Sequence, residues 1–426
     1  MSGYTTHNGL GLATQVEHKG LHNSIAFTKG VDRQYSKEFG VTGAKIGNTI
    51  NIRKPNNYYV SDGNSLHVQD TQEDYTSLTL DHLFHVDVNF TTTDLALSLD
   101  DFSQRILAPA MAKLAAKIDQ TGLAKAVSEV YNQVGFPGSP PGTASTGSAL
   151  TLTAAPWILT NAGRVLNDYA APQNDRSMIL NPAGMANLVA SMSGFYNAQS
   201  EVSKQMLNGF VTRAYGFDFF MDQNIQNITT GNQSGYSDTA TEVRTAPTST
   251  DGYKSLVTEG WTAAAGHVVM KAGEVFTVDT VYGVNPETQL STGELQRFVV
   301  TADAITDGSG YATIAFEPAM IVIGTNVANG TVTNLPNDTC DINLMSGKAS
   351  TSYPVNIAFQ RQAFTLGTAD LELPNGVHFA GRETYDGISL RVIRQYDINT
   401  NTIPCRIEVL CGWKTVRPEW AVKVCG

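Results

Sequence analysis

The sequence predicts an α+β protein that joins one long helix to a mixed region and to a block of short strands. Apolar and polar residues alternate over residues 45–90, which is typical of strands. An apolar stripe at helical spacing runs through residues 98–132, and short alternating runs separated by turn residues fill residues 253–345. Residues 1–40 are polar and interrupted by glycines, so we interpret them as an N-terminal arm outside the core.

Residues 41–90 are interpreted as one long hairpin. Each of its two strands places apolar residues on one face: Ile46, Ile50 and Ile52 in "KIGNTINIRKP", and Leu78, Leu80, Phe84, Val86, Val88 and Phe90 in "SLTLDHLFHVDVNF". The polar stretch "NNYYVSDGNSLHVQDTQED" between them offers nothing from which to build a core. Because a two-stranded hairpin is at best marginally stable alone in water, we expect this one to pack against a neighbouring subunit.

The candidate inter-subunit contacts are charged and aromatic residues at the edge and in the loop of this hairpin: Arg53, Lys54, Tyr58, Tyr59, Asp70, Glu73 and Asp74. The two basic residues beside two tyrosines are also compatible with contact to nucleic acid. However, the same loop carries several acidic residues, which favour solvated or inter-subunit ion pairs.

The segment "SLDDFSQRILAPAMAKLAAKIDQTGLAKAVSEVYN" is predicted to form the long helix. Ser98 is its expected N-cap, and Asp100 and Asp101 are favourable at the positive end of the helix. Its apolar stripe consists of Leu99, Phe102, Ile106, Met111, Leu114 and Ile118. Pro109 is expected to bend the helix and Gly122 to weaken it, and "GFPGSPPGTASTG" ends it.

The remaining chain is predicted to alternate between mixed and all-β regions. Residues 155–222 combine helix and strand signals, with a helix expected at "NPAGMANLVASM" after Asn181. Residues 253–345 are interpreted as a small β-barrel or sandwich, with strands at "GHVVM", "EVFTVDTVYGV" and "AMIVIG" and a hairpin turn at "DGSG". The mixed pattern resumes after Lys348, and the chain is expected to end in a β-hairpin.

Three of the four cysteines, Cys405, Cys411 and Cys425, lie close to the C-terminus. In "IPCRIEVLCGW" the first two share an apolar strand face about 20 Å apart, so they cannot bind one ion or each other. Arg406, Glu408 and Lys414 are expected to point to the other side of that strand. Because no CxxC pair exists, we interpret the cysteines as core residues and not as a zinc site.

Two further patterns resemble metal sites, and we reject both. Asp397, Asn399, Asn401 and Glu408 have the spacing of an EF-hand loop. Thr402 stands where that loop needs glycine, so we predict a β-turn instead. His82 and His85 lie on opposite faces of a strand and cannot share an ion. No catalytic, cofactor-binding or metal-binding residue is predicted.

The composition restricts the class of protein. Charged residues make up 16% of the chain against a usual share of about 25%, which suits broad subunit contacts. The net charge of −11 argues against a dedicated nucleic-acid binder, which needs a basic face. The N-terminus lacks an apolar signal region and no apolar run reaches the length of a membrane span, so we expect neither secretion nor membrane insertion.

The order of these segments resembles the tailed-phage major capsid protein family with the HK97-type fold. Within it, the chain is most similar to coat proteins of short-tailed phages that carry an inserted β-barrel domain. The likeness rests on "FGVTGAKIGNTINIRKP", "LSLDDFSQRILAPAMAKLAAKID", "ILNPAGMANL" and "WKTVRPEWAVKV".

The resemblance implies a division of the chain into the parts of that fold: an arm at 1–40, an extended E-loop hairpin at 41–90, a peripheral domain at 91–150 completed by 385–426, an axial domain at 151–225 completed by 346–384, and an inserted all-β domain at 226–345. It also implies pentamers and hexamers of an icosahedral shell around double-stranded DNA, assembled in the bacterial host cytoplasm. The implied partners are a scaffolding protein, the portal protein and the packaged DNA, with a decoration protein as a further candidate.

Two alternatives remain open at this point. A different phage structural protein, or a β-rich adhesion or receptor-binding protein, would use residues 253–345 to bind a cell-surface ligand. An enzyme would use scattered Asp and Glu residues that converge only in three dimensions. Particle size separates these classes, because a shell protein forms megadalton assemblies.

Overall fold

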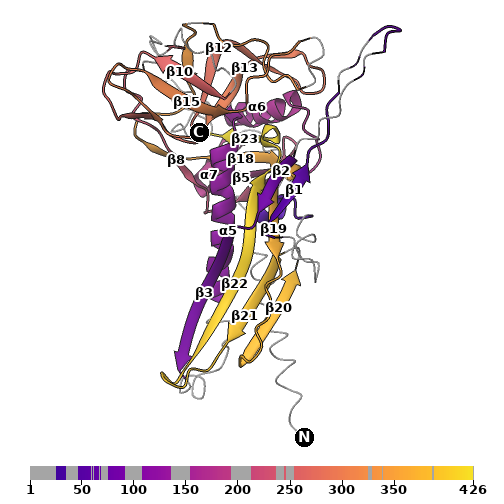
Figure 1. Cartoon of the computed structure of the whole chain (residues 1–426), viewed down its shortest axis with the longest axis vertical. Helices are drawn as coiled ribbons and strands as arrows, with labels where there is room; N and C mark the ends of the chain where they lie inside the picture. The colour runs from indigo at the N-terminus through magenta and orange to yellow at the C-terminus, as the bar shows by residue number, and fades with distance from the viewer. Residues whose placement is uncertain are drawn as a thin grey trace. The chain divides into compact units, whose positions relative to one another are not determined.

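The computed structural model describes residues 25–34, 47–58, 60, 62–66, 68, 75–91, 108–135, 154–192, 213–236, 244–245, 254–324, 329–337, 339–385 and 388–425. The fold is α+β and mainly strand, which confirms the predicted class (Figure 1). The chain forms two compact units. The first unit contains Met1–Arg53, Tyr75–Leu123 and Phe364–Val416, and the second contains Lys54–Asp74, Ala124–Ala363 and Arg417–Gly426.

The first unit is built around the long strand β22 (Thr402–Thr415). β3 (His82–Thr91) pairs along one edge of β22, and β21 (Ile388–Arg394) and β19 (Phe364–Ala369) pair with it as well, with β20 (Phe379–Tyr385) outside β21 (Figure 1). The predicted apolar row of β22 is buried: Ile403, Cys405, Ile407, Val409, Cys411 and Trp413. Glu408 does lie on the opposite face, but it too is buried, because Arg391 of β21 covers it.

The hairpin is shorter than predicted. β1 (Thr49–Arg53) pairs with β2 (Tyr75–Thr79), and Ile50, Ile52 and Leu78 are buried as expected. The prediction that the second arm continues to residue 90 is wrong, because β3 pairs with β22 instead. Gly412 of β22 permits the close approach of β2: a Cβ there would lie 2.0 Å from the Thr79 carbonyl oxygen.

The long helix is α5 (Ala108–Glu129), which ends three residues before the predicted Asn132. Its apolar stripe is buried at Met111, Leu114 and Ile118, as predicted. The expected cap Ser98 and the stripe residues Leu99, Phe102 and Ile106 lie outside the described residues. Pro109 is the second residue of α5, where the missing N–H has no helical partner to lose.

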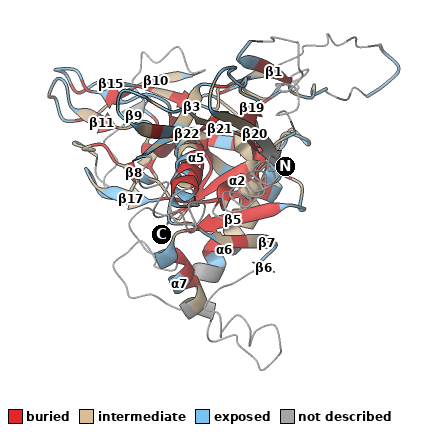
Figure 2. Cartoon of the chain, turned by 90° about the horizontal axis from the view of Figure 1, so that it is seen from below, coloured by how far each residue is buried: buried red, intermediate tan, exposed pale blue. Residues whose placement is uncertain are grey.

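The second unit contains a six-stranded sheet in the order β4-β23-β18-β5-β7-β6. Its strands are β4 (Gln133–Val134), β23 (Ala421–Val424), β18 (Asn356–Gln360), β5 (Arg176–Leu180), β7 (Phe217–Met221) and β6 (Arg213–Ala214). The central strand β5 is buried along its whole length (Figure 2). The helices α6 (Ala154–Asp168) and α7 (Pro182–Met192) share one apolar core with this sheet. α7 begins after Asn181 as predicted, and the Asn181 Oδ1 caps the helix by accepting a hydrogen bond from the Gly184 N–H.

A block of short strands belongs to the same unit, in the sheet order β16-β12-β13-β15-β10-β9. These strands are β16 (Ile342–Leu344), β12 (Val275–Val284), β13 (Ser291–Val300), β15 (Ala312–Glu317), β10 (Ser255–Glu259) and β9 (Arg244–Thr245), and β11 (Val268–Met270) pairs with β14 (Ala304–Ile305). Phe276, Phe298 and Phe316 contact one another in its core. The predicted turn at "DGSG" is present, since Asp307 Oδ1 accepts hydrogen bonds from two turn N–H groups. The strand predicted at "AMIVIG" is wrong beyond a single bridge at Val322.

The strands that flank the block and the last strand of the chain are arranged differently from the prediction. The block is flanked by β8 (Asn227–Thr229) and β17 (Ser352–Pro354), which pair with each other. The predicted C-terminal hairpin is wrong, because β22 and β23 do not pair and belong to different sheets. The short 3₁₀ turn Pro418–Trp420 separates them, so the last strand instead adds to β18 and β4.

Candidate functional site

The loop between β1 and β2 exposes large apolar side chains. Val60 is 99% exposed, Leu66 88%, Val68 79% and Tyr58 58%. Large apolar side chains that are left almost fully in water gain stability when a partner covers them. The loop also carries Asn57, whose Nδ2 donates to Asn329 Oδ1 at 3.0 Å. This loop is therefore the candidate contact surface of the chain.

The structure describes only part of the predicted contact set. Arg53 ends β1 opposite Tyr75 and is exposed, Lys54 is half-buried, and Tyr58 is exposed. Tyr59, Asp70, Glu73 and Asp74 lie outside the described residues. Sequence reasoning missed Val60, Leu66 and Val68, although the available signal was simple: apolar residues scattered through a polar loop without a strand or helix period.

The outer face of the first unit's sheet carries ion pairs between neighbouring strands. The Arg406 guanidinium on β22 makes two hydrogen bonds to Asp87 on β3, at 2.7 and 3.0 Å. These bonds lower the pKa of the Asp87 carboxyl. Arg391 binds the buried Glu408 carboxylate through Nε at 2.7 Å. Each pair fixes the register of the two strands that it joins. At these four residues the charges are neutralised within the sheet.

A buried polar junction holds the strand block to the sheet of the second unit. The Glu274 carboxylate accepts hydrogen bonds from the Gly231 and Lys271 N–H groups and from the Ser346 hydroxyl. Gly231 and Ser346 lie where the chain enters and leaves the block. Lys423 on β23 donates from Nζ to the Gly273 carbonyl at 2.7 Å. Burial raises the pKa of Glu274 and lowers that of Lys423 to about 7.

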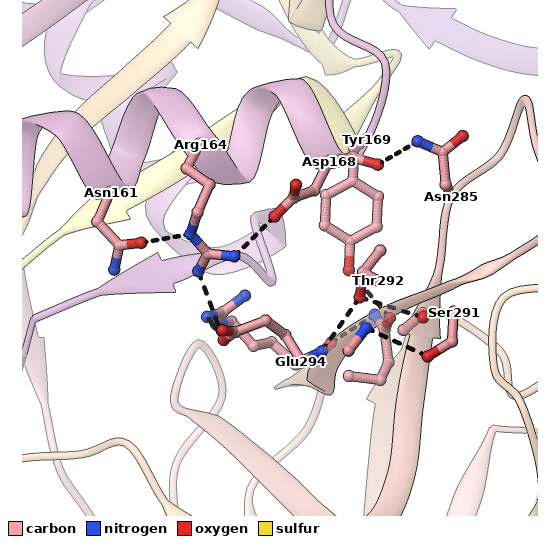
Figure 3. Close-up of polar contacts among 12 residues, drawn as sticks. Asn161, Arg164, Asp168, Tyr169, Asn285, Ser291, Thr292 and Glu294 are labelled. Carbon is pink, nitrogen blue, oxygen red and sulfur yellow. Dashed lines mark hydrogen bonds and ion pairs between the residues drawn. The ribbon is translucent and has the colours of Figure 1, made fainter.

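A second junction joins α6 to the β12–β13 hairpin (Figure 3). The Arg164 guanidinium contacts Asn161 at 2.7 Å, Asp168 at 2.8 Å and Glu294 at 3.4 Å. Each of these ion pairs is partly exposed and contributes about 1 kcal/mol or less. The buried part of the junction is the Tyr169 hydroxyl, which donates to Gln296 Oε1 at 3.0 Å.

We expect Tyr169→Phe to lower the free energy of unfolding by about 1–3 kcal/mol, because it leaves the buried Gln296 oxygen without this donor. Urea denaturation followed by circular dichroism measures the change. Tyr311→Phe is the control, since Tyr311 is exposed and its hydroxyl can bind water. Equal stability of the two variants would contradict the assignment.

The patterns that resembled metal sites have ordinary structures. All four cysteines are buried and free, and burial raises the pKa of Cys411 and of Cys425 to about 12, which keeps both as unreactive thiols. Asp397 and Thr402 close a tight turn between β21 and β22, with Asn401 at φ +54°. No group of three metal-binding side chains occurs among the described residues. None of the helices that the structure describes has the length and apolarity needed to cross a membrane.

Comparisons with known proteins give a family match. The family described as "P22 coat protein - gene protein 5" matches residues 77–426. No curated protein matches the chain. Among solved structures, the chain is similar to one titled Mycobacterium phage Che8, with 12% identity over 94% of this chain and 90% of that chain and a TM-score of 0.48. It is also similar to the mature capsid of bacteriophage PhiM1, with 10% identity over 89% of this chain and 82% of that chain and a TM-score of 0.41.

The family match begins within β2 and covers α5, both large sheets and the strand block. It confirms the resemblance to phage coat proteins that the order of the segments indicated. The chain is a major capsid protein that forms the shell of the virion, and it belongs to the P22 coat protein family.

Proposed function

We propose that copies of this chain assemble as pentamers and hexamers into an icosahedral shell around double-stranded DNA, in the cytoplasm of the bacterial host. Residues 41–90 contain the E-loop, formed by the β1–β2 hairpin and the loop at its tip, and this loop lies on a neighbouring copy. Residues 91–150 with 385–426 form the peripheral domain, residues 151–225 with 346–384 form the axial domain, and residues 226–345 form an inserted all-β domain. The role is structural and involves no catalytic step.

The observation that carries this proposal is the exposure of Val60, Leu66 and Val68. Burying apolar surface contributes about 25 cal/mol per Å², so side chains left in water gain stability when a second copy covers them. The loop's candidate contacts Arg53, Lys54, Tyr58, Tyr59, Asp70, Glu73 and Asp74 would surround this apolar centre as a polar rim, an arrangement typical of subunit interfaces.

The charge of the chain supports a particular relation to the genome. A net charge of −11 gives the inner wall little attraction for phosphates, so the DNA is confined by the shell and not held by it. Scaffolding protein during assembly, portal protein at one vertex and a decoration protein on the outside are the further partners we propose.

The test is a variant in which Val60, Leu66 and Val68 are all replaced by serine. We expect a folded subunit that no longer forms megadalton particles in sedimentation and electron microscopy. These side chains have few contacts in their own subunit, so the circular dichroism spectrum and the thermal midpoint should stay within error of wild type.

The matched control is Ile398→Ser. Ile398 is 79% exposed on the turn between β21 and β22, outside the loop. The Ile398→Ser variant should assemble as wild type does. Normal shells from the triple variant would exclude the loop as the carrier of assembly, whereas loss of shells in both variants would indicate a nonspecific effect of apolar surface.

A further inference from the structure

A short N-terminal segment is held by one carboxylate on the long helix α5, in the part of that helix that belongs to the first unit. Asp119 of α5 is fully buried and accepts hydrogen bonds from the N–H groups of Ala26, Phe27 and Thr28, at 2.8, 3.1 and 3.2 Å. The Thr28 hydroxyl also donates to this carboxylate. Four donors from one short segment therefore converge on a single side chain more than 90 residues away in sequence.

The same segment inserts the Phe27 side chain into an aromatic slot formed by Trp413 and Phe364. Phe27 is fully buried, stacks on Trp413 with ring centroids 5.2 Å apart, and meets the Phe364 ring edge-on at 5.4 Å. Gly122 makes this slot possible, because a Cβ there would lie 2.7 Å from the Trp413 ring and 2.9 Å from the Phe27 ring. Gly122 therefore has a packing role, in addition to the helix weakening expected from its sequence position.

The segment ends by pairing with a strand. Asp32 forms a parallel bridge with Thr365 of β19. The Asp32 N–H donates to the Phe364 carbonyl at 3.1 Å, and the Leu366 N–H donates to the Asp32 carbonyl at 3.0 Å. The exchange of the Leu366 amide thus reports on the segment, although Leu366 belongs to the sheet.

We propose that residues 25–34 form a clasp that docks on α5 and β19 and releases from them as one unit, so that the first unit has a docked and a released state. The clasp donates hydrogen bonds to the Asp119 carboxylate and pairs with the edge of β19, and its apolar side chains Ile25, Phe27 and Val31 are all fully buried. The clasp takes no part in the backbone hydrogen bonds within α5 or in those between β22 and its neighbouring strands. Release of the clasp therefore leaves those hydrogen bonds intact. The conformational entropy regained by the released segment offsets much of what those contacts contribute.

The clasp precedes the hairpin strand β1 in the sequence. Residues 35–46, which lie outside the described residues, connect the clasp directly to β1. The docked and released states of the clasp are a property of the single subunit. They go beyond shell formation and do not depend on the exposed loop between β1 and β2.

Hydrogen exchange of the full chain, read by mass spectrometry on subunits, tests the clasp. We expect the amides of residues 26–28, 32 and 366 to exchange together, at least about tenfold faster than the buried-face amides of α5. Asp119→Asn should accelerate this set by a further factor of about ten and leave α5 unchanged, because the substitution removes the charge that strengthens the hydrogen bonds from residues 26–28.

Two variants keep the test decisive. Thr28→Val removes only the hydroxyl donor and serves if Asp119→Asn does not fold. Lys117→Gln, an exposed change on the same helix, is the control and should leave all exchange rates as in wild type. Exchange of the clasp amides at the same rate as α5, or equal acceleration of both by the variants, would overturn the proposal and make the segment part of one cooperative core.

Discussion

Gly412→Ala is expected to lower the free energy of unfolding of the first unit by about 3 kcal/mol or more. This lies at the upper end of the destabilisation that overpacking a core causes. The new Cβ would lie 2.0 Å from the Thr79 oxygen, 2.8 Å from the Thr79 carbonyl carbon and 2.9 Å from the Leu80 Cα. All three are backbone atoms, so no side chain can rotate to make room. Either β2 moves off β22 and uncovers Ile50, Ile52 and Leu78, or the unit fails to fold. Urea denaturation of the purified subunit measures the loss.

Gly381→Ala is the matched control, in another strand of the same sheet. There the new Cβ would meet only the ring of Phe379, at 3.0 Å, and that ring can shift. We expect a change of about 1 kcal/mol or less. If the two alanine variants unfold at the same urea concentration, close packing of β2 on β22 does not stabilise the first unit.

Local patterns predicted the faces of strands well but not their partners. The alternation in "IPCRIEVLCGW" correctly buried Cys405 and Cys411, since a strand places every second residue on one side whichever strand lies next to it. The alternation in "SLTLDHLFHVDVNF" was also correct in phase, because Leu78 and Leu80 are buried and Phe84, Val86 and Val88 are half-buried, whereas residues 83, 85, 87 and 89 are exposed. Yet its second half pairs with β22, and Asp87 binds Arg406 at a separation of 319 residues. Pairing over such a distance leaves no mark in the local sequence, so the hairpin was predicted too long and the C-terminal strands were wrongly paired.

The roles of single residues were the hardest to predict. Glu408 lies on the face of β22 opposite the apolar row, as expected, but it is buried there because Arg391 of a separate strand covers it. Lys423 lies in the apolar run "WAVKV", where a lysine is ordinarily assigned to the surface. It is buried because the strand block brings the Gly273 carbonyl over that face of β23. Both cases depend on which element covers a sheet, and the sequence pattern of the sheet does not contain that information.

The buried amine of Lys423 should make the stability of the second unit depend on pH above neutrality. Burial lowers its pKa in the folded chain to about 7, from an ordinary 10.5. Between these values the unfolded chain binds a proton that the folded chain does not, so the free energy of unfolding rises with pH, by up to about 1.4 kcal/mol per pH unit. The whole window corresponds to roughly 5 kcal/mol. Glu274 acts in the opposite direction: because burial raises its pKa in the folded chain, stability falls as the pH rises from 4.5 through the raised pKa.

Lys423→Met is therefore expected to abolish the rise between about pH 7 and 10.5, with the free energy of unfolding measured by urea denaturation at several pH values. The order of stability of wild type and the variant should reverse across this pH range. At pH 6 the variant is the more stable, because methionine fills the site without the cost of a buried charge. At pH 10 wild type is the more stable, because its neutral amine still donates to the Gly273 carbonyl, which the variant leaves without this donor. Lys414→Met, at a half-buried position on β22, should follow the wild-type profile. A rise of the same size in the Lys423 variant would show that its amine is not the group that titrates.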